Sequence, residues 1–433
     1  MNMDRRTVGE GLYELYRQDP DEADRLLFGR QTHPDRRGFL KNAGLAAMGA
    51  LVGASIPFHR NMPAHFIPVA LAAEAVIPGK DGLTVLNDRP MCVETPPHLL
   101  DDAITTHRRH FVRNNGLMPE DLDASRWKLA IDGLVDKPVT LGLDDLASRF
   151  EVVTRSLALE CAGNGRAFFD PKTKGEQWTY GAVACSEWTG VRLSDVLKAV
   201  GVHDGAVYTA HYGADTHLSG ESAGLPISRG VPIDKAMDEH NLIAFAQNGR
   251  PIHPMNGGPL RLMVPGWPGS CSQKWLIRIE IRDQVHDGAK MAGTSYRLPG
   301  RGIAPGEAVD EKDSRIIEDM PVKSLISHPA TGHRTNERSV EVRGHAWTGE
   351  GRVDSVDLSI DFGATWMPTT LDEPVNAYAW QNWRTEVPFP REGYYEVWAR
   401  AMDSQGVSQP HAIAWNPGGY LNNAMHRVAV YAE

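Results

Sequence analysis

The sequence predicts an α+β domain followed by a β-sandwich of immunoglobulin-like size. From Arg126 on, strand-like segments mix with short helical ones, and beyond about residue 310 the hydrophobic period changes to two. The chain has 433 residues, 41% of them hydrophobic and 23% charged, which is near the globular average and enough for two or three domains. We therefore expect a leader and cleavage region at 1–75, a mixed domain at 76–310 and a sandwich at 311–433.

The first segment has the pattern of an export leader. Residues 35–41 read DRRGFLK and precede an uncharged, glycine-rich run at 43–58. That run is shorter than the roughly 20 apolar residues needed to span a bilayer. Residues 70–72 (ALA) form a small-x-small site suited to a signal peptidase, although a cut after Ala75 fits as well. The segment resembles a twin-arginine export signal, which predicts a periplasmic protein without a membrane span in the mature chain. The alternative is a buried hairpin with an incidental arginine pair.

The mixed domain contains one clear amphipathic helix and several buried strands. Residues 192–200 place Leu193, Val196, Leu197 and Val200 on one helical face, and Gly201 supplies a stop. Residues 127–131 (WKLAI) and 157–160 (LALE) are typical of strands.

The sandwich is indicated by alternation. Val356, Leu358 and Ile360 alternate with polar residues before a turn at Gly363, and residues 394–398 (YYEVW) repeat the pattern. Residues 298–313 are rich in glycine, proline and charge, which favours a linker between the two domains.

Composition excludes several classes of function. The net charge of −10 disfavours a nucleic-acid or anionic membrane surface. The four cysteines contain no C-x-x-C pair, which excludes a dense disulfide framework, a cysteine zinc ribbon and covalent c-type haem. We expect no haem in this chain. Cys185 and Cys271 have no motif, and a disulfide between Cys92 and Cys185 stays open as an alternative to structural thiols.

Cys161 stands at the end of a predicted strand and runs into a glycine-rich segment, CAGNGR at 161–166. Small residues leave room for a bulky group, while free backbone N–H groups and Arg166 favour a thiolate and nearby anions. A lone cysteine is otherwise most often a small buried hydrophobe. A nucleophilic hydrolase is poorly supported because the sequence has no G-x-S-x-G motif, and the glycine pair is too short for a dinucleotide fingerprint.

Several separated motifs resemble the sulfite oxidase family of molybdenum enzymes. They are FVRN at 111–114, LECAGNGR at 159–166 and KWL at 274–276. DFGATW at 361–366, RAMDS at 400–404 and WN at 415–416 are similar to that family's immunoglobulin-like dimerisation domain. The resemblance covers residues 105–433. It implies that 76–310 is a molybdopterin-binding catalytic domain of the sulfite oxidase type, that 311–433 is an immunoglobulin-like dimerisation domain, and that the protein is a homodimer.

The resemblance also implies a molybdenum–molybdopterin cofactor and its contacts. Cys161 matches the cysteine whose soft thiolate binds the metal. Two positions depart from the family, because Asn115 and Asn256 stand where histidine is usual. An arginine and a lysine converging on the pterin phosphate make physical sense. The implied cofactor-binding set is Phe111, Arg113, Asn114, Asn115, Cys161, Asp215, Asn256, Arg261, Ser272, Gln273 and Lys274.

The substrate pocket follows in the same way. Besides Cys161, the residues Arg113, Arg166, Trp178 and Tyr296 match those that surround an oxyanion beside the metal, and two guanidinium groups on sulfite would offset its charge. Gly418 stands where the animal enzymes have a further arginine. We therefore expect a pocket that is less positive and more open.

Zinc is an alternative for the histidines. His107 and His110 are spaced i, i+3, and His211 and His217 lie close in sequence, but no third ligand is marked. Satisfied or surface histidines are the simpler interpretation.

The resemblance predicts an enzyme that uses molybdenum to oxidise sulfite to sulfate by oxygen-atom transfer. Since the chain contains no motif for covalent haem or an iron–sulfur cluster, we expect a separate cytochrome c as electron acceptor. Two alternatives remain. One is a molybdopterin reductase or dehydrogenase that acts on another sulfur compound, and the other is a secreted binding protein in which Cys161 is inert.

Overall fold

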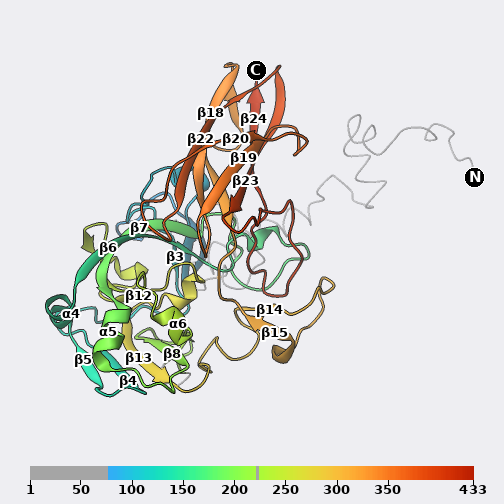
Figure 1. The fold of residues 1–433 in the computed structure, drawn as a ribbon. Helices are drawn as coiled ribbons and strands as arrows, with labels where there is room; N and C mark the ends of the chain where they lie inside the picture. Colours follow the sequence, from blue (N-terminus) through green and yellow to red (C-terminus); the bar gives the residue numbers. More distant parts are fainter. Residues whose placement is uncertain (1–76, 221–223) are drawn as a thin grey trace, which may run out of the picture. The chain divides into compact units, whose positions relative to one another are not determined.

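The computed structural model describes residues 77–220 and 224–433. The expected leader, with its arginine pair and cleavage site, lies outside the described residues. Figure 1 shows that the described chain is built mainly of strands, with few and short helices. Among the described residues, no helix is long and apolar enough to cross a membrane.

Two five-stranded sheets and a small three-stranded sheet form the first part of the chain. The sheet orders are β11-β10-β7-β6, with β12 also paired to β10, then β5-β4-β13-β8-β9, and β1-β2-β3. Their strands are β1 Thr84–Asp88, β2 Met91–Glu94, β3 Val112–Arg113, β4 Leu129–Gly133, β5 Val139–Leu141, β6 Val152–Glu160, β7 Val183–Arg192, β8 Tyr208–Gly213, β9 Ser228–Arg229, β10 Leu242–Gln247, β11 Arg250–Pro251, β12 Arg261–Met263 and β13 Leu276–Arg282.

A single apolar core joins the two larger sheets. Ile131 and Ile279 come from one sheet, Val191 and Ile243 from the other, and all four are fully buried in one cluster. The predicted amphipathic helix packs into this cluster, which confirms its apolar face. The helices are α4 Leu143–Arg149, α5 Leu193–Val200 and α6 Ile233–Ala236, and α5 ends at Gly201 in the left-handed conformation, as the sequence predicts.

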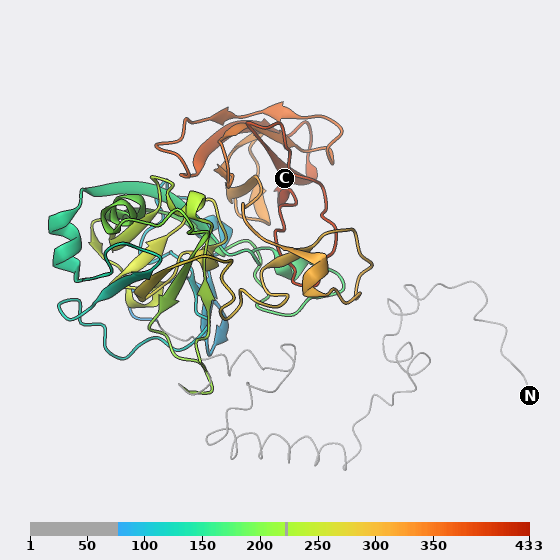
Figure 2. The same ribbon diagram turned by 60° about the horizontal axis from the view of Figure 1, so that its bottom comes forward.

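The second part is a sandwich of two sheets, drawn in orange and red in Figure 2. Val342 and Trp383 from the first sheet share a buried cluster with Val356, Val397 and Val428 from the second. This confirms the predicted β-sandwich. The first sheet has the order β16-β18-β22-β21, from Lys323–His328, Ser339–Trp347, Gln381–Pro388 and Thr370–Leu371; the second has β17-β24-β23-β19-β20, from His333–Thr335, His426–Ala432, Gly393–Asp403, Val353–Ser359 and Met367–Pro368.

One predicted strand ends early. The alternation places Ile360 in a strand, but β19 stops at Ser359. The Ser359 hydroxyl donates to the Asp361 carboxylate (2.7 Å) and accepts from the Gly363 N–H (2.9 Å), so local side-chain bonds turn the chain.

The segment at 298–313 is more ordered at its base than a free linker. Its ends belong to two paired strands, β14 Arg297–Pro299 and β15 Ser314–Ile316, with Pro299 opposite Ser314. The rest of the segment is an excursion from this two-stranded base and includes a short 3-10 helix at Glu311–Asp313.

Candidate active site

The loop after β6 is held by backbone and side-chain bonds on every side. The Cys161 N–H donates to the Ala182 carbonyl (2.9 Å), and the Leu421 N–H donates to the Ala162 carbonyl (2.8 Å). The Asn422 side chain donates to the Gly165 carbonyl (2.9 Å). Gly165 has a φ of 90°, which favours glycine. The cysteine therefore stands on a fixed turn, with its thiol free.

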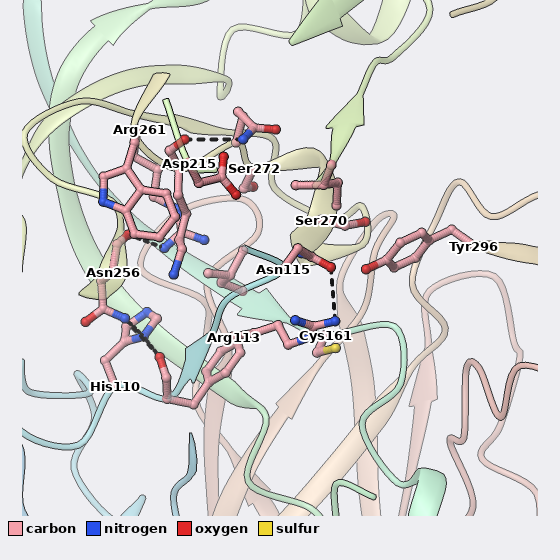
Figure 3. Close-up of a pocket in the computed structure, with 17 residues that line it drawn as sticks. His110, Arg113, Asn115, Cys161, Asp215, Asn256, Arg261, Ser270, Ser272 and Tyr296 are labelled. Atoms are coloured by element: carbon pink, nitrogen blue, oxygen red, sulfur yellow. Dashed lines mark hydrogen bonds between the residues drawn. The ribbon is translucent and has the colours of Figure 1, made fainter. Parts of the chain in front are cut away.

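An inner cavity with a volume of about 50 Å³ opens beside this thiol. Figure 3 shows Cys161, Arg113, Asn115 and Tyr296 together at one end, while Arg261 and Asp215 lie at the other. The inner cavity is lined by ten of the eleven residues that the sequence implied for cofactor binding, namely Phe111, Arg113, Asn115, Cys161, Asp215, Asn256, Arg261, Ser272, Gln273 and Lys274.

Asn114 is the one member of that set outside the cavity lining. Its amide oxygen accepts a hydrogen bond from the Lys274 ammonium, which also donates to the Met255 carbonyl (2.6 Å). Asn114 thus orients a lysine that does line the cavity.

Asn256 links both sides of the cavity. Its amide nitrogen donates to the Phe111 carbonyl (2.9 Å), and its backbone carbonyl accepts from Arg261 (2.7 Å). Its amide oxygen accepts from the Lys80 ammonium (2.5 Å). Lys80 was missed by the sequence analysis because it belongs to no motif and reaches the site only through the tertiary fold.

The far end of the inner cavity is rich in positive charge without carboxylate partners. Burial lowers the pKa of Arg261 to about 9 and of Lys80 to about 7, and it lowers the pKa of Lys274 well below its usual range. None of the three forms an ion pair with a carboxylate in the described part of the chain. Buried cations are unfavourable unless they are paired, so this end is suited to an anionic group such as a phosphate.

Unpartnered polar atoms also line the inner cavity. Asp215 Oδ1, Gln273 Oε1, Arg261 Nε and Ser270 Oγ are buried without a hydrogen-bond partner. Burial raises the pKa of Asp215 to about 6, with Lys274 acting against the rise. Buried polar groups are normally satisfied. Donors and acceptors in this number fit a polar heterocycle with a phosphate tail, and the thiol at the other end fits a soft, thiolate-binding metal.

A middle cavity continues from the thiol end and is lined by Arg113, Cys161, Arg166, Lys290 and Tyr296, among others. Arg166 is 6% exposed. Its Nε donates to the Gly418 carbonyl (2.8 Å) and its Nη1 to the Glu176 carbonyl (3.0 Å), so two backbone oxygens fix the guanidinium.

Tyr296 stands between the inner and middle cavities. Burial raises its pKa to about 12, so the hydroxyl is protonated at neutral pH. Its ring stacks on Tyr420 at 5.4 Å between centroids, and the Arg229 guanidinium covers it at 4.6 Å.

Trp178 lies elsewhere than the sequence analysis expected. It is fully buried, packs edge-on against Phe111 at 6.3 Å, and lines neither cavity. Its place is in the apolar cluster behind Cys161, where it supports Phe111 and the thiol.

The remaining cysteines and histidines have other partners. Cys92 and Cys185 are both buried free thiols and are not joined to each other. His107 bonds the Gln247 carbonyl (2.6 Å), and His211 bonds the Thr209 hydroxyl (2.8 Å). In the described ranges, no three His, Cys, Asp or Glu residues are grouped so that they could hold a metal ion.

Comparison with known proteins defines the class. Residues 115–290 match the oxidoreductase molybdopterin binding domain, and residues 314–433 match the Mo-co oxidoreductase dimerisation domain. The protein is therefore a molybdopterin-dependent oxidoreductase, and the donor set of the inner cavity fits that cofactor.

Individual relatives narrow the class to a family. The chain is 33% identical over 369 residues to human mitochondrial sulfite oxidase, a match that covers 81% of this chain and 66% of the human protein. It is 31% identical over 392 residues to a nitrate reductase of Ulva prolifera, covering 84% and 45%. The crystal structure of the sulfane dehydrogenase SoxCD of Paracoccus pantotrophus aligns with a TM-score of 0.68 at 26% identity, covering 87% and 99%. It is also 31% identical over 365 residues to sulfite oxidase of Gallus gallus, covering 81% of this chain and 78% of that protein. The chain belongs to the sulfite oxidase family.

Proposed function

We propose that this protein oxidises sulfite to sulfate and passes the electrons to a separate cytochrome c. The net reaction converts sulfite and water into sulfate, two protons and two electrons. The observation that carries the proposal is that Arg113, Arg166 and Cys161 line the same cavity. Among the described residues, neither arginine forms an ion pair with a carboxylate. Two guanidinium groups favour a small oxyanion over a neutral substrate.

The cofactor, when bound, supplies two-electron redox chemistry and oxygen-atom transfer. Within this chain, Cys161 would hold the metal through its thiolate, while Arg261 and Lys274 would face the pterin phosphate and Lys80 would hold Asn256 in place. Asp215 would accept from the N–H groups of the pterin.

At the substrate end, the arginines bind and orient the anion, and the rigid anchoring of Arg166 lowers the entropy lost on binding. The Tyr296 hydroxyl is a protonated donor at the boundary between the two cavities, where it would hydrogen-bond an oxygen next to the substrate sulfur.

A steady-state assay tests the substrate. The molybdenum-loaded enzyme should reduce ferricyanide, and separately cytochrome c, when sulfite is added, and it should form one sulfate per two electrons. Nitrate reduction with a reduced viologen in place of sulfite oxidation would contradict the proposal. An absence of molybdenum in properly matured protein would favour the binding-protein alternative.

Another reduced sulfur compound is the second candidate, and a third cavity favours it. This outer cavity has a volume of about 510 Å³ and shares Lys174, Ser295 and Tyr420 with the middle cavity. Gly418 lines it, in keeping with the more open pocket that its small size predicts. A substrate larger than sulfite has room there. Comparing kcat/KM for sulfite with that for thiosulfate and for an organic persulfide distinguishes the two candidates.

We also propose export to the periplasm by the twin-arginine pathway and assembly as a homodimer. The support is the motif at residues 35–41 and the dimerisation-domain match. Replacing Arg36 and Arg37 by lysine should leave active enzyme in the cytoplasm, whereas unchanged periplasmic activity would contradict export by this route. Light scattering of the purified enzyme should give twice the chain mass, and a monomer mass would contradict the dimer.

A further inference from the structure

The segment that carries Tyr296 also carries a lysine with no role so far. Lys290 lines the middle cavity together with Arg113, Cys161, Arg166 and Tyr296. Its side chain is partly buried, and its ammonium has no hydrogen bond or ion pair among the described residues. An ammonium in such a place is available to a ligand.

The backbone around Lys290 is held by hydrogen bonds from strand β9. The Ser228 N–H donates to the Ala289 carbonyl (2.9 Å), and Arg229 Nη1 donates to the Lys290 carbonyl (3.0 Å). The same Arg229 covers the ring of Tyr296. Strand β9 therefore sets the position of both residues that this segment contributes to the cavity.

Both residues also adopt an unusual backbone conformation. Lys290 has a φ of 64° and Tyr296 a φ of 53°. Left-handed backbone at residues other than glycine is uncommon and strained, and it persists where the surrounding structure holds it. Here the strain directs two side chains of one segment to the same cavity.

The charges of the cavity are unbalanced. Arg113, Arg166 and Lys290 line the same cavity. Burial lowers the pKa of Lys290, and the positive charges of Arg113 and Arg166 lower it further. The cavity lining contains one carboxylate, Glu176, whose Oε1 is bonded to the Asn87 amide (3.2 Å). The exposed Lys174 lines the cavity as well, so four cations, Arg113, Arg166, Lys174 and Lys290, surround it. This excess of positive charge is suited to a doubly charged oxyanion.

We propose that Lys290 is a substrate-binding residue that adds a buried positive charge on the oxyanion to those of Arg113 and Arg166. Lys290 supplies a positive charge in place of the further arginine of the animal enzymes, whose position is Gly418 in this chain. The sequence alone predicts a less positive pocket. An arginine at position 418 would not serve as well here, because a Cβ on Gly418 would overlap the ring of Tyr420, which stacks on Tyr296. The inference rests on the proposed function for the identity of the oxyanion, but not for the site itself.

Steady-state kinetics of the loaded enzyme with sulfite and ferricyanide provide the first test. Lys290→Met keeps an unbranched stem of similar length and removes the charge. We expect the KM for sulfite to rise about tenfold or more with kcat within about twofold, because a charge-assisted contact to the ground-state anion is lost. Lys290→Arg should restore most of the KM. Lys198→Met on the exposed side of α5 removes the same charge elsewhere and should leave both constants unchanged.

Binding of sulfate, measured by calorimetry on the loaded enzyme, is the second test. Wild type and Lys290→Arg should bind sulfate, and Lys290→Met should bind it at least about tenfold more weakly. Unchanged KM and unchanged sulfate binding in Lys290→Met would overturn the inference, as would an absence of sulfate binding in wild type. A wild type that binds sulfate through Lys290 but does not turn over sulfite would refute the proposed function and leave this inference standing.

Discussion

Arg166 shows how one side chain links the catalytic loop to the sandwich. Its guanidinium is held by two backbone carbonyls and lies over the ring of Tyr420 at 5.1 Å, so its orientation does not depend on substrate. Gly163 permits this arrangement, because a Cβ there would lie 2.6 Å from the guanidinium. Charge and direction are therefore both set before the anion arrives.

We expect Arg166→Gln to lower kcat/KM for sulfite by about 10-fold to 150-fold, corresponding to about 1.5–3 kcal/mol for a charge-assisted bond. Arg166→Lys should lose a similar amount, because one ammonium cannot reach both carbonyls and the anion. Arg149→Gln, which changes an exposed arginine of α4, serves as the control. Equal kcat/KM in wild type and Arg166→Gln would place Arg166 outside the substrate site.

The sequence predicted the residues that belong to motifs and missed those that reach the site through the fold. Cys161 and Arg261 were found because their neighbours in the chain are distinctive. Lys80 and Lys290 were not, since their positions depend on Asn256 and Arg229, which are distant in sequence. Trp178 was expected at the pocket, and the structure buries its ring against Phe111 with the indole N–H left without a hydrogen-bond partner.

At the scale of elements, hydrophobic alternation predicted where strands lie. It predicted less well at which residue each strand ends. The α5 helix agrees with the prediction because its apolar face and its glycine stop indicate the same boundaries. Ile360 packs against the sandwich core as its alternation predicts, but it lies one residue beyond the end of β19, because the Ser359 hydroxyl turns the chain there. The segment at 298–313 has the composition of a linker, and composition does not reveal that its ends pair as strands.

A buried ion pair connects β6 to the sandwich. Lys323 Nζ on β16 lies 2.8 Å from Glu160 Oε1, and both side chains are nearly inaccessible, at 6% and 4% exposure. Glu160 also accepts from the Trp347 indole (2.8 Å) and from the Asn164 amide (2.9 Å). The residue just before Cys161 is thus anchored by two strands of the other domain.

Lys323→Met should lower the free energy of unfolding by about 3–5 kcal/mol, because it leaves the Glu160 carboxylate buried without its cation. Urea unfolding measures this loss. The double variant Lys323→Met, Glu160→Gln should recover part of the stability, since the uncompensated charge is then gone. A double variant less stable than Lys323→Met alone would contradict the account.

At the scale of the whole molecule, the cofactor is expected to act as a structural element. Burial lowers the pKa values of Arg261, Lys274 and Lys80, and the charge of Arg261 lowers those of the two lysines further, so these cations are costly when no anion lies beside them. When a phosphate group binds, these cations should stabilise the folded protein instead of destabilising it, because the phosphate supplies the missing negative charge.

Lys274→Met should therefore act in opposite directions on two forms of the protein. The cofactor-free protein should gain about 1–3 kcal/mol of stability by losing an unpaired buried charge, while protein made in a cofactor-producing strain should contain less molybdenum. Thermal melting of the first and metal analysis of the second measure the two effects. A cofactor-free variant that melts below wild type would show that Lys274 stabilises the fold by itself.

The acidity of the chain bears on electron transfer. With a net charge of −10, we expect a basic cytochrome c to be attracted at low ionic strength, so that its reduction by the sulfite-reduced enzyme slows as salt is added. Stopped-flow absorbance across a salt series measures the rate. A salt-independent rate would remove the electrostatic part of the docking proposal.

The anchoring of the catalytic loop by Glu160, Leu421 and Asn422 has a consequence for recombination. The two family domains are separate units when sequences are compared, but the cysteine loop of this chain is finished by contacts from residues beyond 313. Exchange of the sandwich between relatives therefore exchanges part of the active-site scaffold. A hybrid enzyme inherits a working loop only when the incoming domain carries counterparts of Lys323 and Asn422, so the boundary between the domains is not a neutral place to cut and join genes.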